Sequence, residues 1–367
     1  MTPAAHLPAL LPVFLRDPGI ASTLDLAGWD LLMRQAAHSD MGATVRSLLD
    51  EAGKLGLAPA APREHLAWWG VAAERHARAV RFEVARIREV LDSLGLPLIL
   101  LKGAAYSMAA LPAARGRLFS DIDILVPKGR LVEVESALML HGWASTHHDE
   151  YDQRYYRQWM HELPPLVHVH RGNAIDVHHA ILPETAPARP DPDKLRAAAV
   201  ALPGEPGLWT LCPHDMFLHS AVHLFWGGEF NHGLRDLFDL HRLALHFGAR
   251  PGFWDGLAAR AAELELARPL FYALRWCVRM LGTPVPAAVL AQAAAGGGRP
   301  NGALLALMDA LFARALLPLH PSCGGRALAL AHFALYVRGN WLRMPPLLLS
   351  RHLFHKAFLS PKAAEAV

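Results

Sequence analysis

The hydrophobic pattern of this chain changes from helical to strand-like at Pro97, and this change constrains the fold more than any other feature of the sequence. Upstream, apolar residues recur at spacings of three and four from Ala73 to Leu91, which predicts one apolar face of a long helix ending at Gly95. Downstream, the continuous apolar run from Pro97 to Leu101 is typical of a short buried strand. The chain is therefore expected to combine helices with a small sheet.

The strand-like region extends beyond this first run. Residues 121–126 (Asp-Ile-Asp-Ile-Leu-Val) predict a second strand, and residues 166–181 predict a β-hairpin around a turn at 171–173. Helical patterns over 103–110 and 131–140 lie between these segments. The alternation predicts one compact unit in which helices pack on a small mixed sheet.

Helical patterns lie on both sides of this unit. The proline-rich stretch 183–206 predicts a linker or an extended wrap, and the pattern is helical again from residue 208 onward. We therefore expect an α+β fold with three parts: an N-terminal helical region at 1–95, a small mixed β-sheet core at 96–206 and a C-terminal helical domain at 207–367.

The composition excludes several classes of protein. Hydrophobic residues make up 53% of the chain and charged residues 19%, which provides a large core and rules out a disordered chain. Three cysteines lie far apart without a Cys-x-x-Cys motif, which excludes a disulfide scaffold and a cysteine zinc ribbon. Neither an export signal nor an apolar run of about 20 residues is recognisable, so we expect a soluble, cytoplasmic protein.

Two carboxylates on the second predicted strand form the first candidate site. Alternate side chains of a strand share a face, so Asp121 and Asp123 point the same way, with Cα atoms about 6.6 Å apart. Carboxylates this close repel each other, and a divalent cation such as Mg²⁺ or Mn²⁺ resolves the conflict. If the strand of Asp176 lies beside this one, it supplies a third carboxylate for two metal ions about 3.5–4 Å apart. The alternative is that Asp121 caps a turn and Asp123 lies on the surface.

A lysine and a glycine follow the first predicted strand, where a helix is expected to begin. Gly103 allows a ligand to approach the backbone closely, and the start of a helix offers free N–H groups to an anion. Lys102 adds a positive charge that suits a phosphate. The alternative is an ordinary strand-to-helix turn with a lysine on the surface.

Together these motifs resemble the family of bacterial uncharacterised nucleotidyltransferases, within the polymerase-beta-like nucleotidyltransferase superfamily. The family pattern is Leu-Lys-Gly, a helix, Arg-x-x-x-Asp-Ile-Asp-Leu-Leu-Val, and later a strand with Asp-x-His. Matching segments begin here at Leu101, Arg117 and Asp176. The resemblance covers roughly residues 96–245 and continues through His219-x-x-x-His223 and Leu234-Arg235-x-x-x-Asp239.

The resemblance implies a two-metal reaction in which an acceptor oxygen attacks the α-phosphate of a nucleoside triphosphate and pyrophosphate leaves. Asp121, Asp123 and Asp176 would hold Mg²⁺ or Mn²⁺, with Asp176 as a base or as the third metal ligand. Lys102 and Arg117 would stabilise the negative charge of the transition state. Arg117 equally suits a structural ion pair with Asp121 or Asp123.

The nucleoside triphosphate is expected between Gly103 and the C-terminal helices, because a site at a sheet edge needs a second wall. Arg235 and Asp239 are four residues apart and can instead pair with each other. The chain departs from the wider superfamily at one phosphate contact. The superfamily has Gly-Ser after the first strand, and the serine hydroxyl usually touches a phosphate; here Gly103-Ala104 stands in its place, so this hydroxyl is missing. The residues expected on the second wall are His219, His223, Arg235 and Asp239.

Histidine is abundant, with 22 residues in the chain. By strand alternation, His178 lies on the same face as Asp176, so we place it near the site. His219 and His223 share a helix face and are a conceivable zinc pair, but no Glu follows His219, which excludes the His-Glu-x-x-His signature. Ordinary hydrogen-bonded histidines are the more common alternative.

Two other functions stay open. A retired transferase domain that acts as a binding or scaffold module would keep the fold without the activity, although the intact carboxylates argue against it. A metal-dependent glycosyltransferase also uses Asp-x-Asp, but it needs a larger nucleotide-binding sheet before the motif, and mostly helices precede Pro97. Metal-dependent binding of a nucleoside triphosphate is expected of the nucleotidyltransferase alone.

The acceptor is constrained by charge. Residues 96–200 contain 11 Lys and Arg against 12 Asp and Glu, so the core has no basic stripe of the kind that long nucleic acid requires. We expect a small molecule, a sugar or a protein side chain as acceptor. From Ala331 onward five basic residues face one acid, a composition that suits a membrane surface or a partner. A C-terminal helix packed on its own domain is the favoured alternative.

Overall fold

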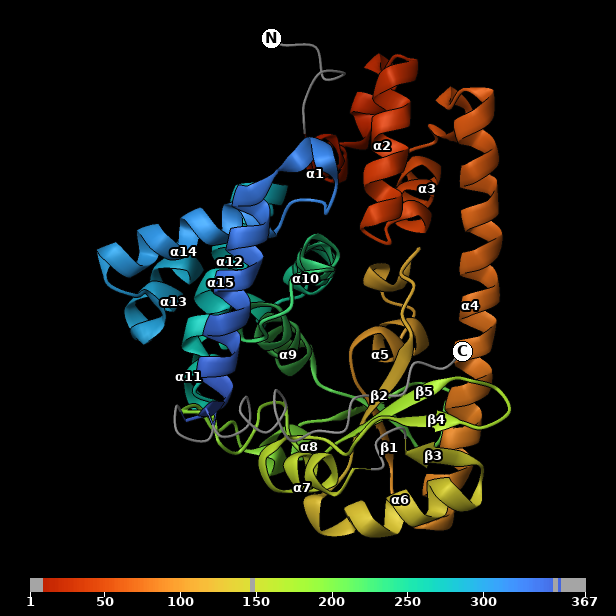
Figure 1. Cartoon of the computed structure of the whole chain (residues 1–367), viewed down its shortest axis with the longest axis vertical. Coiled ribbons are helices and arrows are strands. Elements are labelled where there is room, and N and C mark those ends of the chain that lie inside the picture. The colour runs from red at the N-terminus through yellow and green to blue at the C-terminus, as the bar shows by residue number, and fades with distance from the viewer. Residues whose placement is uncertain (1–8, 146–148, 346–348, 351–367) are drawn as a thin grey trace.

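The computed structural model describes residues 9–145, 149–345 and 349–350. Figure 1 shows the sheet low in the molecule, with the long helix α4 running along one side and the C-terminal helices gathered on the other. Within the described ranges, no helix is long and apolar enough to cross a membrane. The predicted α+β fold, a small mixed sheet between helical flanks, is confirmed.

The N-terminal helices end in α4, which forms as the apolar spacing predicts. It runs over 34 residues and buries Val80, Val84 and Ile87 along one face. It ends where Gly95 adopts a left-handed φ of +68° and its N–H donates to the carbonyl of Asp92, a common helix C-cap that suits glycine. The helices of this part are α1 (Leu10–Arg16), α2 (Leu26–His38), α3 (Gly42–Glu51) and α4 (Ala60–Ser93).

The sheet has seven strands in the order β3-β4-β5-β2-β1-β7-β6. Its centre is β2, which pairs antiparallel with β1 and parallel with β5. The predicted hairpin is present as the antiparallel pair β4 and β5. The strands are β1 (Leu98–Leu100), β2 (Asp121–Leu125), β3 (Trp143–Ser145), β4 (Leu166–His168), β5 (Ala174–His178), β6 (Val200–Ala201) and β7 (Leu208–Thr210).

Several elements of the core were not predicted. The expected linker at 183–206 contains a short helix and an edge strand, and residues 208–210, expected to be helical, form β7 beside β1. These strands have two or three residues, too few to establish an alternating pattern. The helices of the core are α5 (Lys102–Met108), α6 (Leu131–Leu140), α7 (Glu150–Trp159) and α8 (Pro192–Ala197).

The C-terminal helices pack around α9 and α12, and α9 also contacts α5 of the core. Buried side chains form one continuous hydrophobic core from Trp29 of α2 through Ile124 of β2 to Phe312 of α14. The basic tail begins in α15, which packs on α14 and α9; its later part, residues 351–367, lies outside the described residues. These helices are α9 (Pro213–Trp226), α10 (Gly233–Gly248), α11 (Phe253–Glu263), α12 (Ala267–Leu281), α13 (Ala287–Ala293), α14 (Gly302–Ala315) and α15 (Arg326–Arg343).

Candidate active site

The sheet places two of the predicted carboxylates directly opposite each other. Because β2 and β5 are parallel neighbours, Asp123 pairs in register with Asp176. Asp121 lies two residues earlier, opposite Ala174. The expected neighbourhood of the two strands is thus present, and since adjacent strands are about 4.8 Å apart, the Cα atoms of Asp123 and Asp176 are close enough to share a metal site. The same spacing places the Cα of Asp121 roughly 8 Å from that of Asp176.

Asp123 is the most buried of the three and is surrounded by positive charge. Asp123 is only 3% exposed. Its Oδ1 lies 2.7 Å from Lys102 Nζ and 2.9 Å from His178 Nε2. Burial alone would raise the pKa of Asp123, but Lys102 and His178 outweigh it and hold this pKa well below its usual range. Asp123 is therefore ionised at neutral pH, not a protonated or surface carboxyl.

Asp176 has the opposite environment. Its burial and the negative charges of Asp123 and Glu162 raise its pKa to about 7. The repulsion expected between Asp121 and Asp123 does not protonate Asp123; the carboxyl whose protonated form is favoured is Asp176, on the neighbouring strand. A carboxyl with a pKa near neutrality can take up or release a proton under ordinary conditions.

Together with His178, this pair of aspartates forms a group of donors suited to a cation. Ligand atoms of Asp123, Asp176 and His178 all lie within 4.8 Å of one another. Two carboxylates and one imidazole match the donors that Mn²⁺ accepts, and the oxygen pair suits Mg²⁺. Asp121 is not part of this compact group. That Asp121, Asp123 and Asp176 bind metal stays a prediction.

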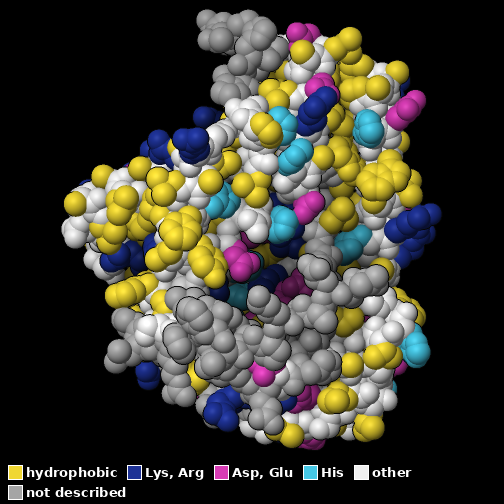
Figure 2. All heavy atoms as spheres, viewed as in Figure 1, with side chains coloured by type: hydrophobic (Ala, Val, Ile, Leu, Met, Phe, Trp, Pro, Cys, Tyr) yellow, Lys and Arg dark blue, Asp and Glu magenta, His cyan; other side chains and the backbone are white. Residues whose placement is uncertain are grey.

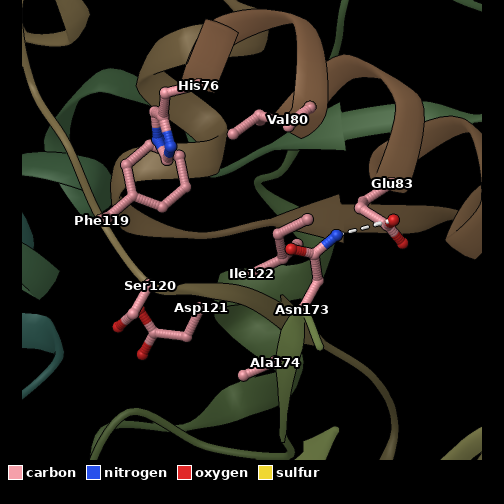
Figure 3. A pocket seen from close by; sticks show the side chains of 10 residues that line it. His76, Val80, Glu83, Phe119, Ser120, Asp121, Ile122, Asn173 and Ala174 are labelled. Atoms are coloured by element: carbon pink, nitrogen blue, oxygen red, sulfur yellow. Dashed lines mark hydrogen bonds between the residues drawn. The ribbon is translucent and has the colours of Figure 1, made fainter. Parts of the chain in front are cut away.

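Asp121 lies at the half-buried start of β2. Figure 3 shows it beside Ser120, whose hydroxyl donates to Asp121 Oδ1 at 3.3 Å. A cavity of about 60 Å³ separates this strand end from α4, and across it Asn173 donates to Glu83 at 2.7 Å. Within the described part of the chain no ion pair reaches Asp121, so its carboxylate is available to a ligand.

Lys102 and Gly103 form the predicted junction between β1 and α5. Lys102 has a φ of +44°, in the left-handed region that side chains other than glycine rarely adopt, and its Nζ points to Asp123. A Cβ on Gly103 would come within 2.4 Å of Arg117 Nη1 and 2.7 Å of Phe119. Glycine is thus required there by the approach of Arg117 and Phe119. Lys102 is not the free surface lysine of the alternative interpretation.

Arg117 forms an ion pair, but its partners are not Asp121 or Asp123. Its Nε lies 2.6 Å from Asp239 Oδ2 and its Nη2 3.8 Å from Asp236 Oδ1, both on α10. The guanidinium also lies over the rings of Tyr106 and Phe119. The suggested pairing with Asp121 or Asp123 is therefore wrong. So is the suggested pairing of Arg235 with Asp239, because the Arg235 Nε instead lies 3.4 Å from Asp236 Oδ1.

A cavity of about 610 Å³ opens in front of β2, between the core and the helices of both flanks. Figure 2 shows histidine, acidic and basic side chains gathered in the hollow at the centre of this face. Several predicted site residues line this cavity, whereas Asp176, His178, His219 and Asp239 do not. The lining residues are Asp40, Lys102, Gly103, Arg117, Leu118, Phe119, Ser120, Asp121, Asp123, His223, Glu229, His232 and Arg235.

The two helical histidines differ in exposure. His219 is buried, with only 4% of its surface exposed. This burial and the charges of Lys102 and His178 lower its pKa well below the usual range. His223 is 45% exposed toward the cavity, with Nε2 3.7 Å from Asp236 Oδ2. Partial burial in the cavity wall and the positive charge of Lys102 lower its pKa below the ordinary value. Neither belongs to a metal-binding group among the described residues.

Sequence analysis missed Glu162. It forms an isolated antiparallel bridge with His178, and its Oε2 lies 3.2 Å from His178 Nδ1. No motif could have identified it, because the contact depends on how the segment after α7 folds back onto β5. It adds a further carboxylate beside the pair of aspartates.

The fold and the site define a class of protein. A mixed sheet presents carboxylates from neighbouring parallel strands beside a large polar cavity, an arrangement suited to metal-assisted transfer of phosphate-bearing groups. A family model described as Uncharacterised nucleotidyltransferase matches residues 25–282, and the chain belongs to this family. The resemblance seen in the sequence is thereby confirmed and extends into both helical flanks. No curated protein and no solved structure gave a significant match.

Proposed function

We propose that this protein transfers a nucleoside monophosphate from a nucleoside triphosphate to a hydroxyl or similar acceptor, with Mg²⁺ or Mn²⁺ as cofactor. The observation that carries the proposal is the register of β2 and β5, which puts Asp176 directly beside Asp123, a residue that lines the cavity. Membership of the nucleotidyltransferase family supports it. The cavity volume of about 610 Å³ is within the range of small-molecule sites, roughly 300–1,000 Å³.

The reaction forms one bond and breaks one. The acceptor oxygen bonds to the α-phosphorus, the bond from that phosphorus to the bridging oxygen breaks, and pyrophosphate leaves. A bound divalent cation would polarise the phosphate oxygens and lower the pKa of the acceptor hydroxyl. Asp123 and Asp176, with Asp121 at the cavity, are the residues that would hold it. Asp176 would act as the base for the acceptor proton or as the third ligand of the cation.

The cations of the site have separate roles in this proposal. Lys102 neutralises Asp123 in the metal-free protein, and a cation at Asp123 would free its side chain to contact a phosphate. Arg117 holds the cavity wall through Asp239, so it orients α10 against the core more than it contacts the substrate. Arg235 and His223 face the cavity and would contact the nucleotide.

The acceptor proposed is a small molecule, a sugar or a protein side chain. The cavity lining carries four carboxylates and three permanent cations, and its permanent charges sum close to neutral. Long nucleic acid would need an excess of basic residues along its path. The charge balance therefore favours a compact acceptor.

One observation favours the retired binding module as the second candidate. Lys102 Nζ lies 2.7 Å from the carboxylate oxygen of Asp123 that a metal would use, and the hydroxyl of the wider superfamily is replaced by Ala104. In that case Lys102 would permanently take the place of a cation. The protein would then bind a nucleotide without turning it over.

Release of pyrophosphate from a nucleoside triphosphate, measured with a panel of nucleotides and acceptors, tests the proposal. We expect Mg²⁺-dependent turnover in the wild type and a loss of about 1,000-fold or more in Asp123→Asn, because one charge that balances the cation is removed. Asp255→Asn, an exposed change on α11, is the matched control and should retain activity. Nucleotide binding that needs no metal, without turnover in the wild type, would support the binding module instead.

A further inference from the structure

The segment joining α7 to β4 brings a second group of metal-binding side chains against the end of β5. Glu162 bridges His178, and the backbone N–H of His179 donates to the carbonyl of His161 at 2.8 Å. The rings of His161 and His178 have centroids 5.3 Å apart. Two imidazoles and one carboxylate from two separate segments therefore lie together.

Two ring nitrogens of this group make no hydrogen bond of good geometry among the described residues. The Nε2 of His178 contacts Asp123, whereas its Nδ1 has no hydrogen bond within the described residues. The buried Nδ1 of His161 has none there either. Native proteins seldom leave buried nitrogens unpaired, and an unobserved ion is one of the standard reasons. The Oε2 of Glu162 lies 3.2 Å from His178 Nδ1.

We propose that His161, Glu162 and His178 form a binding site for one divalent transition-metal ion of the zinc class. Their ligand atoms all lie within 4.8 Å of one another. Imidazole nitrogens with one carboxylate suit zinc and other late first-row transition metals, whereas Mg²⁺ prefers oxygen donors alone. The site shares His178 with the group around Asp123 and Asp176, differs from it in having two imidazoles and one carboxylate, and does not depend on the proposed reaction.

The geometry is close to what such an ion needs. Two ligands of a tetrahedral zinc ion, each bonded at about 2.0–2.1 Å, lie roughly 3.3 Å apart, which is close to the 3.2 Å between Glu162 Oε2 and His178 Nδ1. Both the Glu162 and the His161 side chains keep 18% exposure, which gives an ion access and leaves room for water as a fourth ligand. His178 also has the usual outer contact of a metal-binding histidine, because its other nitrogen points to the Asp123 carboxylate.

An ion at this position would act on the neighbouring site through His178. It would fix the segment of residues 161 and 162 to the end of β5 and hold the His178 ring in one orientation. Since His178 contacts Asp123 at 2.9 Å, the ion would also hold the Asp123 carboxylate in place. His161 and Glu162 are therefore positioning residues for Asp123.

The test is zinc binding by the full chain after removal of metals with a chelator. Equilibrium dialysis against zinc, with metal content measured by mass spectrometry, should find one tight equivalent in the wild type. His161→Ala and Glu162→Gln each remove one of three protein ligands and should weaken this equivalent about 100-fold or more, beyond the effect of losing an outer contact. X-ray absorption of the zinc-loaded protein should show two imidazole ligands.

Two variants serve as controls. His170→Ala removes an exposed histidine of the hairpin turn, and Asp176→Asn removes the oxygen group; both should keep the tight zinc equivalent. If His161→Ala does not fold, the near-isosteric Glu162→Gln decides the outcome. The proposal is overturned if the wild type has no tight equivalent, if the ligand variants keep it, or if Asp176→Asn loses it equally. Pyrophosphate release is measured separately, so failure of this site leaves the proposed function standing.

Discussion

The two carboxylates that face each other across β2 and β5 differ in what surrounds them. Asp123 lies between Lys102 and His178, whereas Asp176 faces Asp123 and Glu162. The burial of Asp176 and these negative neighbours favour its protonated form, and the cations around Asp123 favour its ionised form. Similar substitutions at the two positions should therefore change stability in opposite directions.

Asp123→Asn should destabilise the metal-free protein. From the sequence alone, relief of the repulsion between Asp121 and Asp123 predicts a small loss or even a gain in the free energy of unfolding. The structure gives the opposite expectation, because the change leaves the buried ammonium of Lys102 without its partner. Breaking a buried ion pair costs about 3–5 kcal/mol. Urea unfolding in the presence of a chelator measures this, and an unchanged midpoint would contradict the buried pair.

Asp176→Asn should stabilise the metal-free protein above neutral pH. The pKa of Asp176 is about 7 in the folded protein and about 4 when unfolded, so the folded state holds the proton more tightly. Its contribution to stability is present below about pH 4 and is lost as the pH rises to about 7. Asn does not titrate, so we expect the variant to avoid this loss. Its free energy of unfolding should exceed that of the wild type by at least about 1 kcal/mol at pH 8 and differ little at pH 4. Urea unfolding with chelator at both pH values checks the sign; a gain that is equal at both would contradict it.

The sequence predicts individual site residues where local geometry decides their direction. Strand alternation correctly put His178 on the face of Asp176, because the two-residue period of a strand is fixed, whereas the pairing of Asp176 with Asp123 comes from the register of β2 and β5. It could not predict that Arg117 pairs with Asp239, 122 residues away, since that contact depends on how α10 packs against the core.

At the scale of elements, one buried ion pair connects the segment before β2 to α10. Arg117→Ala would leave the buried Asp239 and the half-buried Asp236 near each other without this cation. We expect a loss of about 3–5 kcal/mol in the free energy of unfolding. Arg115→Ala is the matched control, because its pair with Glu51 is exposed and should contribute about 1 kcal/mol or less. Similar losses in both variants would show that burial does not distinguish the two pairs.

The elements predicted correctly are those with a strong repeating pattern. The long helix α4, the strands β1 and β2 and the hairpin of β4 and β5 all have such patterns. The missed strands β3, β6 and β7 are short, and they are held in the sheet by pairing with neighbours rather than by a local signal. The proline-rich stretch suggested a linker because proline is rare inside strands, yet α8 begins at Pro192, where proline is well tolerated.

At the scale of the whole molecule, the cavity joins all three parts of the chain. Asp40 comes from the N-terminal helices, Lys102 from the core, and His223 and Arg235 from the C-terminal helices. A ligand that fills this cavity would contact all three parts at once. Because a ligand that binds only the folded protein stabilises it by mass action, a bound nucleotide should raise the unfolding temperature of the whole chain.

The C-terminal wall of the cavity is tested by the double variant His223→Ala and Arg235→Ala. Both side chains face the cavity, and Arg235 supplies a permanent positive charge that a triphosphate would contact. We expect the affinity for a nucleoside triphosphate with Mg²⁺, measured by calorimetry, to fall by about tenfold or more, since a hydrogen bond to a charged group is worth about 1.5–3 kcal/mol. The matched control is His246→Ala with Arg250→Ala, a contacting pair at the far end of α10 that does not line the cavity. Unchanged affinity in the first double variant would mean that the nucleotide binds against another wall, while an equal loss in the control would assign the effect to α10 as a whole.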